Sequence, residues 1–334
     1  MLSRKIAIDL GTVNVTMAER EQIILHEPSV VAITVDEEIV VEVGQPARDM
    51  YGRTPETIEV TRPMRDGVIA DYFVTEAMLE YFLRNRVRGG VRLFKPTVMV
   101  TVPYGVTSVE RRAVHEASME AGAREVRLIP EPLASAIGAG LPIDTPTGNL
   151  IVNIGGGTSE AAVVAMNGIV AAASERIGGV RLDRAIVDYV RKKYNLIIGD
   201  LTAEIAKVNI GAATDIGEEL RMDIQGRDQV DGMPKMITLT TSEIVEALEE
   251  PLGVISTVIK RVLERTPPEL ASDIIDRGMV LTGGTALLRG IDQYLTQTTN
   301  VPAFLADDPV GATALGASRG LERIDVLSRT VPNM

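Results

Sequence analysis

IAIDLGTVNVTMA (residues 6–18) and IVNIGGGTSEAAVVA (residues 151–165) repeat one pattern in the two halves of the chain. Each begins with an apolar run, passes an Asp or Asn and a short glycine turn, and ends in a second β-prone run. The pattern predicts a strand, a tight turn and a returning antiparallel strand. Because glycine has no Cβ, backbone N–H groups of such turns can approach an anion closely, and two facing hairpins can grip a polyphosphate. The copies differ in charge, since Asp9 in the first corresponds to Asn153 in the second.

Length and composition limit the classes of protein. The chain has 334 residues, 45% hydrophobic and 24% charged, which predicts two domains of a soluble globular protein. It has no Cys, so disulfides, thiolate metal sites and thiol nucleophiles are excluded, and two His leave little room for a His-rich metal centre. The net charge of −12 argues against a nucleic-acid partner, because phosphate contacts need a basic surface.

The N-terminal sequence favours a cytoplasmic protein. MLSRKIAIDLG passes from two basic residues directly into a short strand, so we expect no signal peptide. No apolar run reaches the roughly 18 residues that a membrane-spanning helix needs.

Strands and helices alternate in both halves, which predicts α/β layers around a central sheet. The main helices are expected over residues 74–87, 107–122, 182–195, 202–211 and 242–265. The Pro/Gly-rich stretch LPIDTPTG (141–148) suits a hinge between the halves.

Three of these helices carry sharper expectations. We expect Ser108 to cap its helix without a capping box, because Arg111 rather than Glu stands at the third position. We expect Thr202 to cap the helix that it opens, and Pro251 to interrupt the last of the five helices.

Three glycine turns follow predicted strands: DLGT (9–12), NIGGGT (153–158) and LTGGT (281–285). A single such turn is more often an ordinary β-turn than a phosphate-binding loop. Three in this order, together with a duplicated hairpin, are far more specific for a nucleotide site.

With these turns the chain resembles the superfamily of actin, sugar kinases and DnaK-type chaperones, and within it the MreB family of bacterial actins. The resemblance runs from about residue 4 to about residue 322. It rests on IDLGTVN (8–14), EPSVVA (27–32), RPMRDGVIADY (62–72), VERRAV (109–114), AGAREVRLIPEPLASAIGAGLP (121–142), IGGGTSE (154–160), TPPELASDIIDRGMVLTGG (266–284) and DDP (307–309).

The resemblance implies an actin-like ATPase fold, in which two related α/β domains with ribonuclease H-like cores flank a nucleotide cleft. Each domain would carry a smaller inserted subdomain. Domain I would comprise residues 1–142 and about 310–334, with its small subdomain at about 32–74. Domain II would comprise residues 143–309, with its small subdomain at about 181–245.

The resemblance also implies ATP or ADP with Mg²⁺ as ligands. The residues that would bind the nucleotide are Gly11, Thr12, Val13 and Asn14 in the first phosphate loop, Asn153, Gly155, Gly156, Gly157 and Thr158 in the second, Gly283, Gly284 and Thr285 against the adenosine, and Glu204 and Lys207 at ribose and base. Catalytic roles would fall to Glu131, which orients the attacking water, to Thr158, and to Asp9. Asp9 would hold Mg²⁺ through water, because this ion keeps several waters and few direct protein ligands.

Each assignment has a structural alternative. Asp9 could form a turn at a strand end, and Glu131 could be a first-turn acid favoured by the helix dipole. Glu204 and Lys207 could form a solvated ion pair on one helix face. Thr158 could be only a hairpin hydroxyl.

The sequence departs from the resembling family at four positions. Asn153 replaces an acid, Val15 a threonine, Val180 an aspartate, and Thr285 a glycine where a purine ring is expected. Because backbone donors do most of the phosphate binding, we expect ATP to bind while hydrolysis is slowed.

A loop with the sequence RVRGGVRLFKP (86–96) is a candidate membrane contact. Leu93 and Phe94 stand beside Arg92 and Lys95, and apolar side chains ringed by cations suit an anionic bilayer. The alternative is a solvated turn whose apolar side chains fold into the core. The resemblance favours the membrane, because MreB-like proteins dock through this loop.

The sequence therefore predicts a cytoplasmic, ATP-binding actin-like protein, peripheral at the inner face of the cell membrane. It would assemble head to tail into filaments, which pair antiparallel in the family, and work with cell-wall elongation proteins in rod shape. Slow ATP hydrolysis would accompany polymerisation. The alternatives are a small-metabolite kinase of the same fold, for which no catalytic base beyond Glu131 is evident, and a poorly hydrolysing paralogue that co-assembles with a normal MreB. A DnaK-type chaperone would need a peptide-binding domain for which this length leaves no space.

Overall fold

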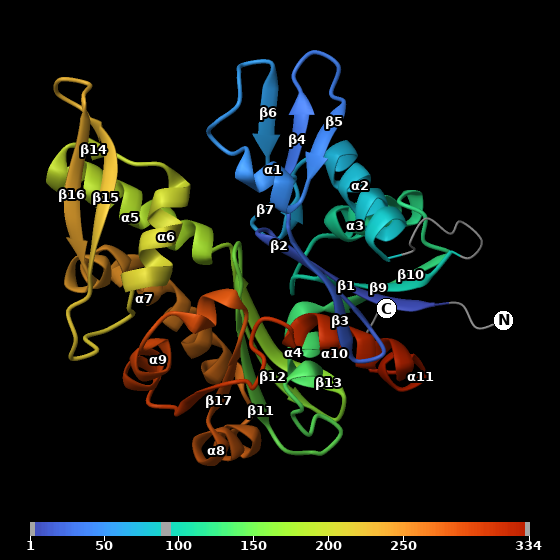
Figure 1. Ribbon diagram of the computed structural model, residues 1–334. Coiled ribbons are helices and arrows are strands. Elements are labelled where there is room, and N and C mark those ends of the chain that lie inside the picture. Colours follow the sequence, from blue (N-terminus) through green and yellow to red (C-terminus); the bar gives the residue numbers. More distant parts are fainter. Residues whose placement is uncertain (1–3, 88–94, 331–334) are drawn as a thin grey trace.

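Two five-stranded sheets form the centre of the molecule, as the computed structural model shows for residues 4–87 and 95–330 (Figure 1). The first has the order β10-β9-β1-β2-β3, and its strands are β1 (Lys5–Leu10), β2 (Asn14–Glu19), β3 (Gln22–Pro28), β9 (Thr97–Val102) and β10 (Glu125–Pro130). The second has the order β13-β12-β11-β17-β18, and its strands are β11 (Asn149–Ile154), β12 (Ser159–Ala165), β13 (Gly168–Glu175), β17 (Met279–Thr282) and β18 (Ala303–Leu305).

Both sheets have the same topology. In each, three consecutive strands form an antiparallel meander, β1-β2-β3 or β11-β12-β13. The first strand of the meander also pairs in parallel with a later strand, which pairs in parallel with one more. The two predicted hairpins, β1-β2 and β11-β12, therefore occupy equivalent places. The predicted α/β architecture with two related halves is confirmed.

Two helices fill the space between the sheets. α4 (Glu131–Gly138) and α10 (Ala312–Glu322) cross so closely that a Cβ on Gly316 would lie 1.7 Å from the carbonyl oxygen of Ala134. Their buried alanines share one apolar cluster with side chains from both sheets. This layer fixes the two sheets relative to each other.

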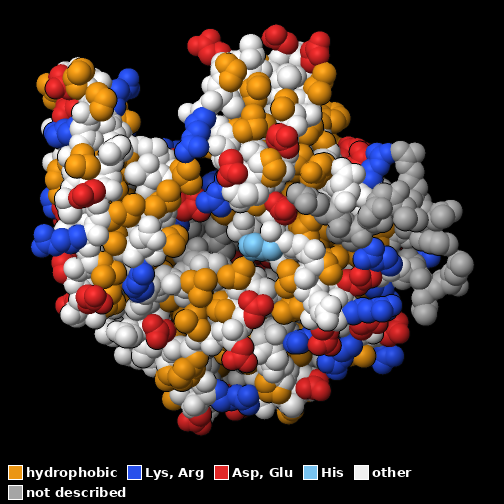
Figure 2. Space-filling model, viewed as in Figure 1, with side chains coloured by type: hydrophobic (Ala, Val, Ile, Leu, Met, Phe, Trp, Pro, Cys, Tyr) orange, Lys and Arg blue, Asp and Glu red, His pale blue; other side chains and the backbone are white. Residues whose placement is uncertain are grey.

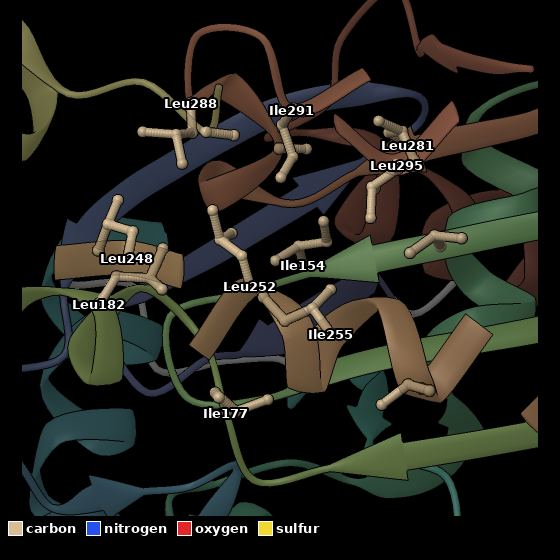
Figure 3. Packing of buried hydrophobic residues seen from close by; sticks show 14 of the residues in the cluster. Ile154, Ile177, Leu182, Leu248, Leu252, Ile255, Leu281, Leu288, Ile291 and Leu295 are labelled. Carbon is tan, nitrogen blue, oxygen red and sulfur yellow. The ribbon is translucent and has the colours of Figure 1, made fainter. Parts of the chain in front are cut away.

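The remaining helices cover the outer faces of the sheets. On the first sheet these are α2 (Tyr72–Tyr81), the π-helical segment η1 (Phe82–Val87) and α3 (Ser108–Glu120), and on the second α7 (Thr241–Arg265), α8 (Pro268–Arg277), the 3₁₀ turn η2 (Gly284–Leu287) and α9 (Ile291–Thr299). The helix α5 (Gly179–Tyr194) packs against α7 and the short strand β14 (Leu196–Ile197). The short α11 (Ile324–Leu327) follows α10. Each sheet thus has its own apolar core. Figure 3 shows the core of the second sheet, in which Leu252 and Ile255 of α7 lie near Ile154 of β11.

The helix α7 runs unbroken over 25 residues, so the predicted interruption at Pro251 is wrong. A proline inside a helix removes one hydrogen bond. Pro251 is buried in the face that carries Leu248 and Leu252, and burial of this apolar face outweighs the lost bond.

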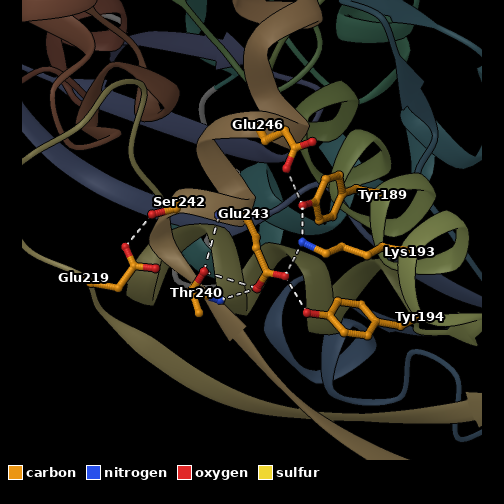
Figure 4. A network of polar contacts seen from close by, with 8 residues as sticks. All are labelled: Tyr189, Lys193, Tyr194, Glu219, Thr240, Ser242, Glu243 and Glu246. Carbon is orange, nitrogen blue, oxygen red and sulfur yellow. Dashed lines mark hydrogen bonds and ion pairs between the residues drawn. The ribbon is translucent and has the colours of Figure 1, made fainter.

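The N-terminus of α7 is fixed by polar contacts (Figure 4). Thr240 and Glu243 form a capping box, and Glu243 also accepts from the Tyr194 hydroxyl. Lys193 Nζ lies 2.8 Å from Glu243 Oε1. The cap therefore also joins α7 to α5.

Two predicted helix caps are wrong. The N-cap of α3 is Thr107, one residue earlier than predicted, which places Glu110 at the third position and completes a capping box. Either of two adjacent hydroxyl residues can cap a helix, and here only Thr107 has a glutamate at the required spacing. The helix α6 (Asp200–Ile210) begins with Gly199 as N-cap, so Thr202 lies within its first turn.

Two small sheets form separate arms beside each other (Figure 1). One arm contains β4 (Val31–Thr34), β5 (Val40–Val43), β6 (Ile58–Thr61) and α1 (Gln45–Asp49), and the other contains β14 (Leu196–Ile197), β15 (Arg221–Asp228), β16 (Pro234–Thr240) and α6. The hairpin of β7 (Met64–Arg65) and β8 (Val68–Ile69) follows the first arm. The surface is hollowed between the arms (Figure 2). The domain limits given above stay a prediction.

Among the helices formed by the described residues, none combines the length and the apolar character needed to cross a bilayer.

Candidate functional site

A cleft below the two arms collects the predicted nucleotide residues. Its lining includes all of them: Asp9, Gly11, Thr12, Val13, Asn14, Glu131, Asn153, Gly155, Gly156, Gly157, Thr158, Glu204, Lys207, Gly283, Gly284 and Thr285. They come from both central sheets, from α4 and from α6. The three glycine turns, far apart in the sequence, therefore meet in one place.

The first two turns have the same internal geometry. Gly11 N donates to Asn14 O at 3.2 Å, and Gly155 N donates to Thr158 O at 2.8 Å. The turns also approach each other closely, because a Cβ on Gly157 would lie 2.2 Å from Thr12 Oγ1. Only glycine fits there, so the pair forms a narrow cradle rich in backbone donors.

The β7-β8 hairpin lies over this cradle. Gly67 N donates to Thr12 Oγ1 at 2.9 Å, and a Cβ on Gly67 would lie 2.7 Å from Thr158 Cγ2. The hairpin thus contacts both turns, and Thr12 and Thr158 are buried beneath it.

Asp9 and Glu131 line the base of the cleft, and the fully buried Glu160 lies beside Glu131. Asp9 accepts from Thr101 Oγ1 at 2.8 Å, and its burial raises its pKa to about 6. Glu131 is the first residue of α4. Its pKa is raised well above the ordinary value, chiefly by burial and then by the negative charges of Glu160 and Asp9. Burial raises the pKa of Glu160 to about 7, although Tyr104 N donates to it at 2.7 Å. Such a concentration of carboxylates is stabilised by a cation.

The donor chemistry fits Mg²⁺ held through water. Within residues 4–87 and 95–330, no three His, Cys, Asp or Glu side chains are arranged to hold a metal ion directly. Asp9 and Asn153 offer oxygen atoms at equivalent strand ends, and Mg²⁺ accepts few protein ligands when waters and phosphates complete its octahedron.

Asn153 connects the cluster to β17. Its Nδ2 donates to Glu131 Oε2 at 3.3 Å, and its Oδ1 accepts from Thr282 Oγ1 at 3.3 Å. The amide is buried. It therefore orients the Glu131 carboxylate without adding a charge.

Thr285 joins two of the glycine turns. Its Oγ1 donates to Gly155 O at 2.8 Å. The side chain that stands in place of the expected glycine therefore binds the second turn. Nearby, Gly283 has φ +90°, and a Cβ there would lie 2.3 Å from Ile154 O. The third turn thus packs against the second.

Glu204 and Lys207 line the cleft from α6, but they do not pair with each other. Lys207 Nζ lies 2.6 Å from Asp183 Oδ1 and donates to Gly179 O at 3.0 Å. Glu204 Oε1 accepts from Arg48 Nη2 at 2.8 Å, and Arg48 belongs to α1 in the opposite arm. This ion pair bridges the arms.

The structure adds residues that sequence reasoning missed. Arg62, Gly67, Asp183, Val310 and Thr313 also line the cleft. Arg62 and Gly67 lie within the motif RPMRDG, and this motif could have indicated that they belong to the site.

Of the four predicted membrane residues, the structure describes one. Arg92, Leu93 and Phe94 lie outside the described residues, and Lys95 is exposed just before β9.

Two like sheets, each with an inserted arm, around a cleft of glycine turns define an actin-like protein, and solved structures agree. The crystal structure of MreB 5 of Spiroplasma citri bound to AMPPNP superposes with a TM-score of 0.91 at 34% identity, covering 97% of this chain and 98% of that one. A MamK double helical filament superposes with a TM-score of 0.80 at 18% identity over 95% of this chain and 99% of that one, which shows the fold alone.

Sequence comparison gives the family. The profile described as MreB/Mbl protein matches residues 3–329. The chain is 49% identical over 331 residues to the cell shape-determining protein MreB of Escherichia coli (strain K12), covering 98% of this chain and 95% of the relative. It is 44% identical over 330 residues to the cell shape-determining protein Mbl of Bacillus subtilis (strain 168), covering 98% and 99%. The chain belongs to the MreB/Mbl family.

Proposed function

We propose that this chain is an ATP-binding, actin-like cytoskeletal protein that assembles into filaments and determines cell shape. The observation that carries the proposal is the meeting of three glycine turns in one cleft, with buried acids at its base. Its relative from Spiroplasma citri is described as bound to AMPPNP and, in a second structure, to ADP.

Within the cleft we assign phosphate binding to the first two turns and adenosine to Gly283, Gly284 and Thr285. Mg²⁺, when bound, would neutralise phosphate charge, and Asp9 would hold waters of its hydration shell. Glu131 would accept hydrogen bonds from the attacking water and orient it, while Thr158 would contact the terminal phosphate. Glu204 and Lys207 would bound the ribose side.

Calorimetric titration with ATP and ADP in magnesium chloride tests this assignment. We expect binding of both, and a loss of binding when bulk is added at the cradle by Gly157→Val. Absence of binding by the wild-type protein would contradict the proposal.

Assembly is supported by apolar side chains at opposite ends of the molecule. Val230 is 84% exposed at the turn between β15 and β16, and Ile275 of α8 is 66% exposed. In Figure 1 this turn is at the upper left and α8 at the bottom. Exposed apolar side chains on two different surfaces suit head-to-tail contacts, which produce open filaments.

Sedimentation and electron microscopy with ATP test assembly. We expect Val230→Asp to prevent sedimentation while ATP binding is retained. Met166→Asp is the matched control, because Met166 is also exposed but lies at the β12-β13 turn. Equal sedimentation of Val230→Asp and wild type would contradict the head-to-tail arrangement.

We further propose that the filaments lie on the inner face of the cell membrane and organise cell-wall elongation. Support comes from the curated relatives, which are named as determinants of cell shape, and from the apolar and basic sequence around Leu93 and Phe94. Changing both residues to Ser should abolish sedimentation with anionic liposomes and leave assembly intact. Retained liposome binding would rule out this loop.

A further inference from the structure

Arg62 is a cleft residue to which the assignments above give no role. It follows β6 and lines the cleft from the side of the first arm. Its Nε atom is buried, and no atom of the described residues forms a hydrogen bond with it. A buried donor without a partner is unfavourable, so this guanidinium group requires explanation.

The other cation that lines the cleft is already engaged. Lys207 contacts the Asp183 carboxylate and the Gly179 carbonyl. Burial raises the pKa of Asp183 to about 6, and the positive charges of Lys207 and Arg62 oppose this rise. No atom of the described residues accepts a hydrogen bond from the Nε of Arg62, so the protein does not satisfy this guanidinium group fully.

The position of Arg62 is fixed next to the second phosphate loop. The chain that continues from Arg62 places Asp66 so that a Cβ on Gly157 would lie 3.1 Å from its Cα. Gly67 in the same hairpin contacts Thr158 and donates to Thr12. The backbone on which Arg62 stands is therefore packed on the glycine cradle.

We propose that Arg62 binds the phosphate groups of the nucleotide held by the glycine cradle, an inference that rests on the proposed nucleotide binding. The planar guanidinium fork matches phosphate oxygens in geometry and charge. A phosphate group there would face the guanidinium group of Arg62, which lines the cleft. Because Arg62 stands on the first arm and Gly155 to Gly157 belong to the second sheet, a bound phosphate would link the two halves.

Titration calorimetry of Arg62→Ala with ATP, ADP and adenosine tests the proposal. We expect affinity for ATP and ADP to fall by roughly tenfold to a hundredfold, as for a lost charge-assisted hydrogen bond, while affinity for adenosine stays unchanged. The matched control is Arg65→Ala, since Arg65 is exposed in β7 on the same segment. Arg62→Lys keeps the charge without the fork and should recover part of the affinity.

The outcomes for Arg62 and for nucleotide binding itself can be told apart. A wild-type protein that binds none of the three ligands contradicts both. Unchanged ATP affinity in Arg62→Ala, or an equal loss for adenosine, overturns the role of Arg62 and leaves nucleotide binding intact. Circular dichroism establishes folding. If Arg62→Ala is unfolded, Arg62→Gln, which is closer in length and removes the charge, must show the same phosphate-selective loss for the proposal to stand.

Discussion

At position 153, an amide lies among carboxyl groups. Asn153 donates to Glu131 and accepts from Thr282, so the residue holds Glu131 in place without repelling it. Asp9, the equivalent residue of the first hairpin, is itself an acid. An aspartate at position 153 would therefore join Asp9, Glu131 and Glu160 in a cluster of four carboxyl groups.

Replacing Asn153 by Asp tests the expectation of slow hydrolysis. The new carboxylate would give Mg²⁺ a second acidic neighbour. We expect phosphate release to rise roughly tenfold or more, within the ~10²–10⁴ range of acid–base effects. The gain should require magnesium chloride, and a magnesium-free assay is the control. If release with magnesium stays at the wild-type rate, Asn153 does not limit hydrolysis.

Glu160 makes a pH-dependent contribution to stability. Its pKa in the folded state is about 7, above the ordinary 4.5, so the folded state holds this proton more tightly. Protonation then stabilises the fold below the ordinary pKa, and this stabilisation is lost as pH rises through about 7. Each pH unit between the two pKa values corresponds to about 1.4 kcal/mol. Denaturant unfolding without nucleotide should show a falling free energy of unfolding from about pH 5 to about pH 8.

The variant Glu160→Gln is the control for this pH effect. Glutamine keeps an acceptor for Tyr104 N and cannot titrate, so the slope of stability against pH should flatten. A wild-type slope in the variant would assign the effect to Asp9 or Glu131 instead.

At the scale of elements, local patterns predicted much of the fold. The hairpins and glycine turns were predictable because each is specified by neighbouring residues, as the shared bonds of Gly11 and Gly155 show. The cap of α3 was misplaced by one residue because Thr107 and Ser108 are equally good caps until the spacing to Glu110 is considered. Pro251 was misjudged because the core around α7 outweighs a local preference.

Contacts between elements that lie far apart in the chain could not be predicted from the sequence. Nothing near Arg48 predicts that its partner is Glu204, and nothing near Lys207 predicts Asp183. These pairs depend on how the arms pack, which periodicity does not encode. The position of Arg62 in the cleft also depends on this packing.

The crossing of α4 and α10 depends on glycine. A Cβ at Gly316 would meet the Ala134 carbonyl at 1.7 Å, so Gly316→Ala must push the helices apart. We expect thermal or denaturant unfolding to show a loss of roughly 1–3 kcal/mol. Gly253→Ala in α7 is the control, because nothing lies within 4 Å of its added Cβ. It should raise stability by up to ~1 kcal/mol. Equal effects of the two substitutions would refute the steric account.

For the whole molecule, the ion pair between Arg48 and Glu204 links the two arms. The pair is largely buried, with side-chain exposures of 27% and 19%. It lies at the entrance on the side of α6, where the nucleoside is proposed to bind. Its opening should therefore accompany release of the nucleotide.

Arg48→Ala should accelerate release of a fluorescent ADP roughly threefold to tenfold, because an ion pair of this kind contributes about 1 kcal/mol. Arg53→Ala, at an exposed position of the same arm, should release ADP at the wild-type rate. Unaltered release from Arg48→Ala would show that the arms separate independently of this pair.

The common topology of the two sheets has an evolutionary consequence. A chain of two like halves is the product expected from doubling and fusion of one ancestral unit, whose paired copies would have offered the ligand identical walls. The corresponding strand ends of the present chain differ in charge, since Asp9 of the first half corresponds to Asn153 of the second. A bound polyphosphate would therefore meet an acid at the end of β1 and an amide at the end of β11, so the two walls of the cleft are not interchangeable.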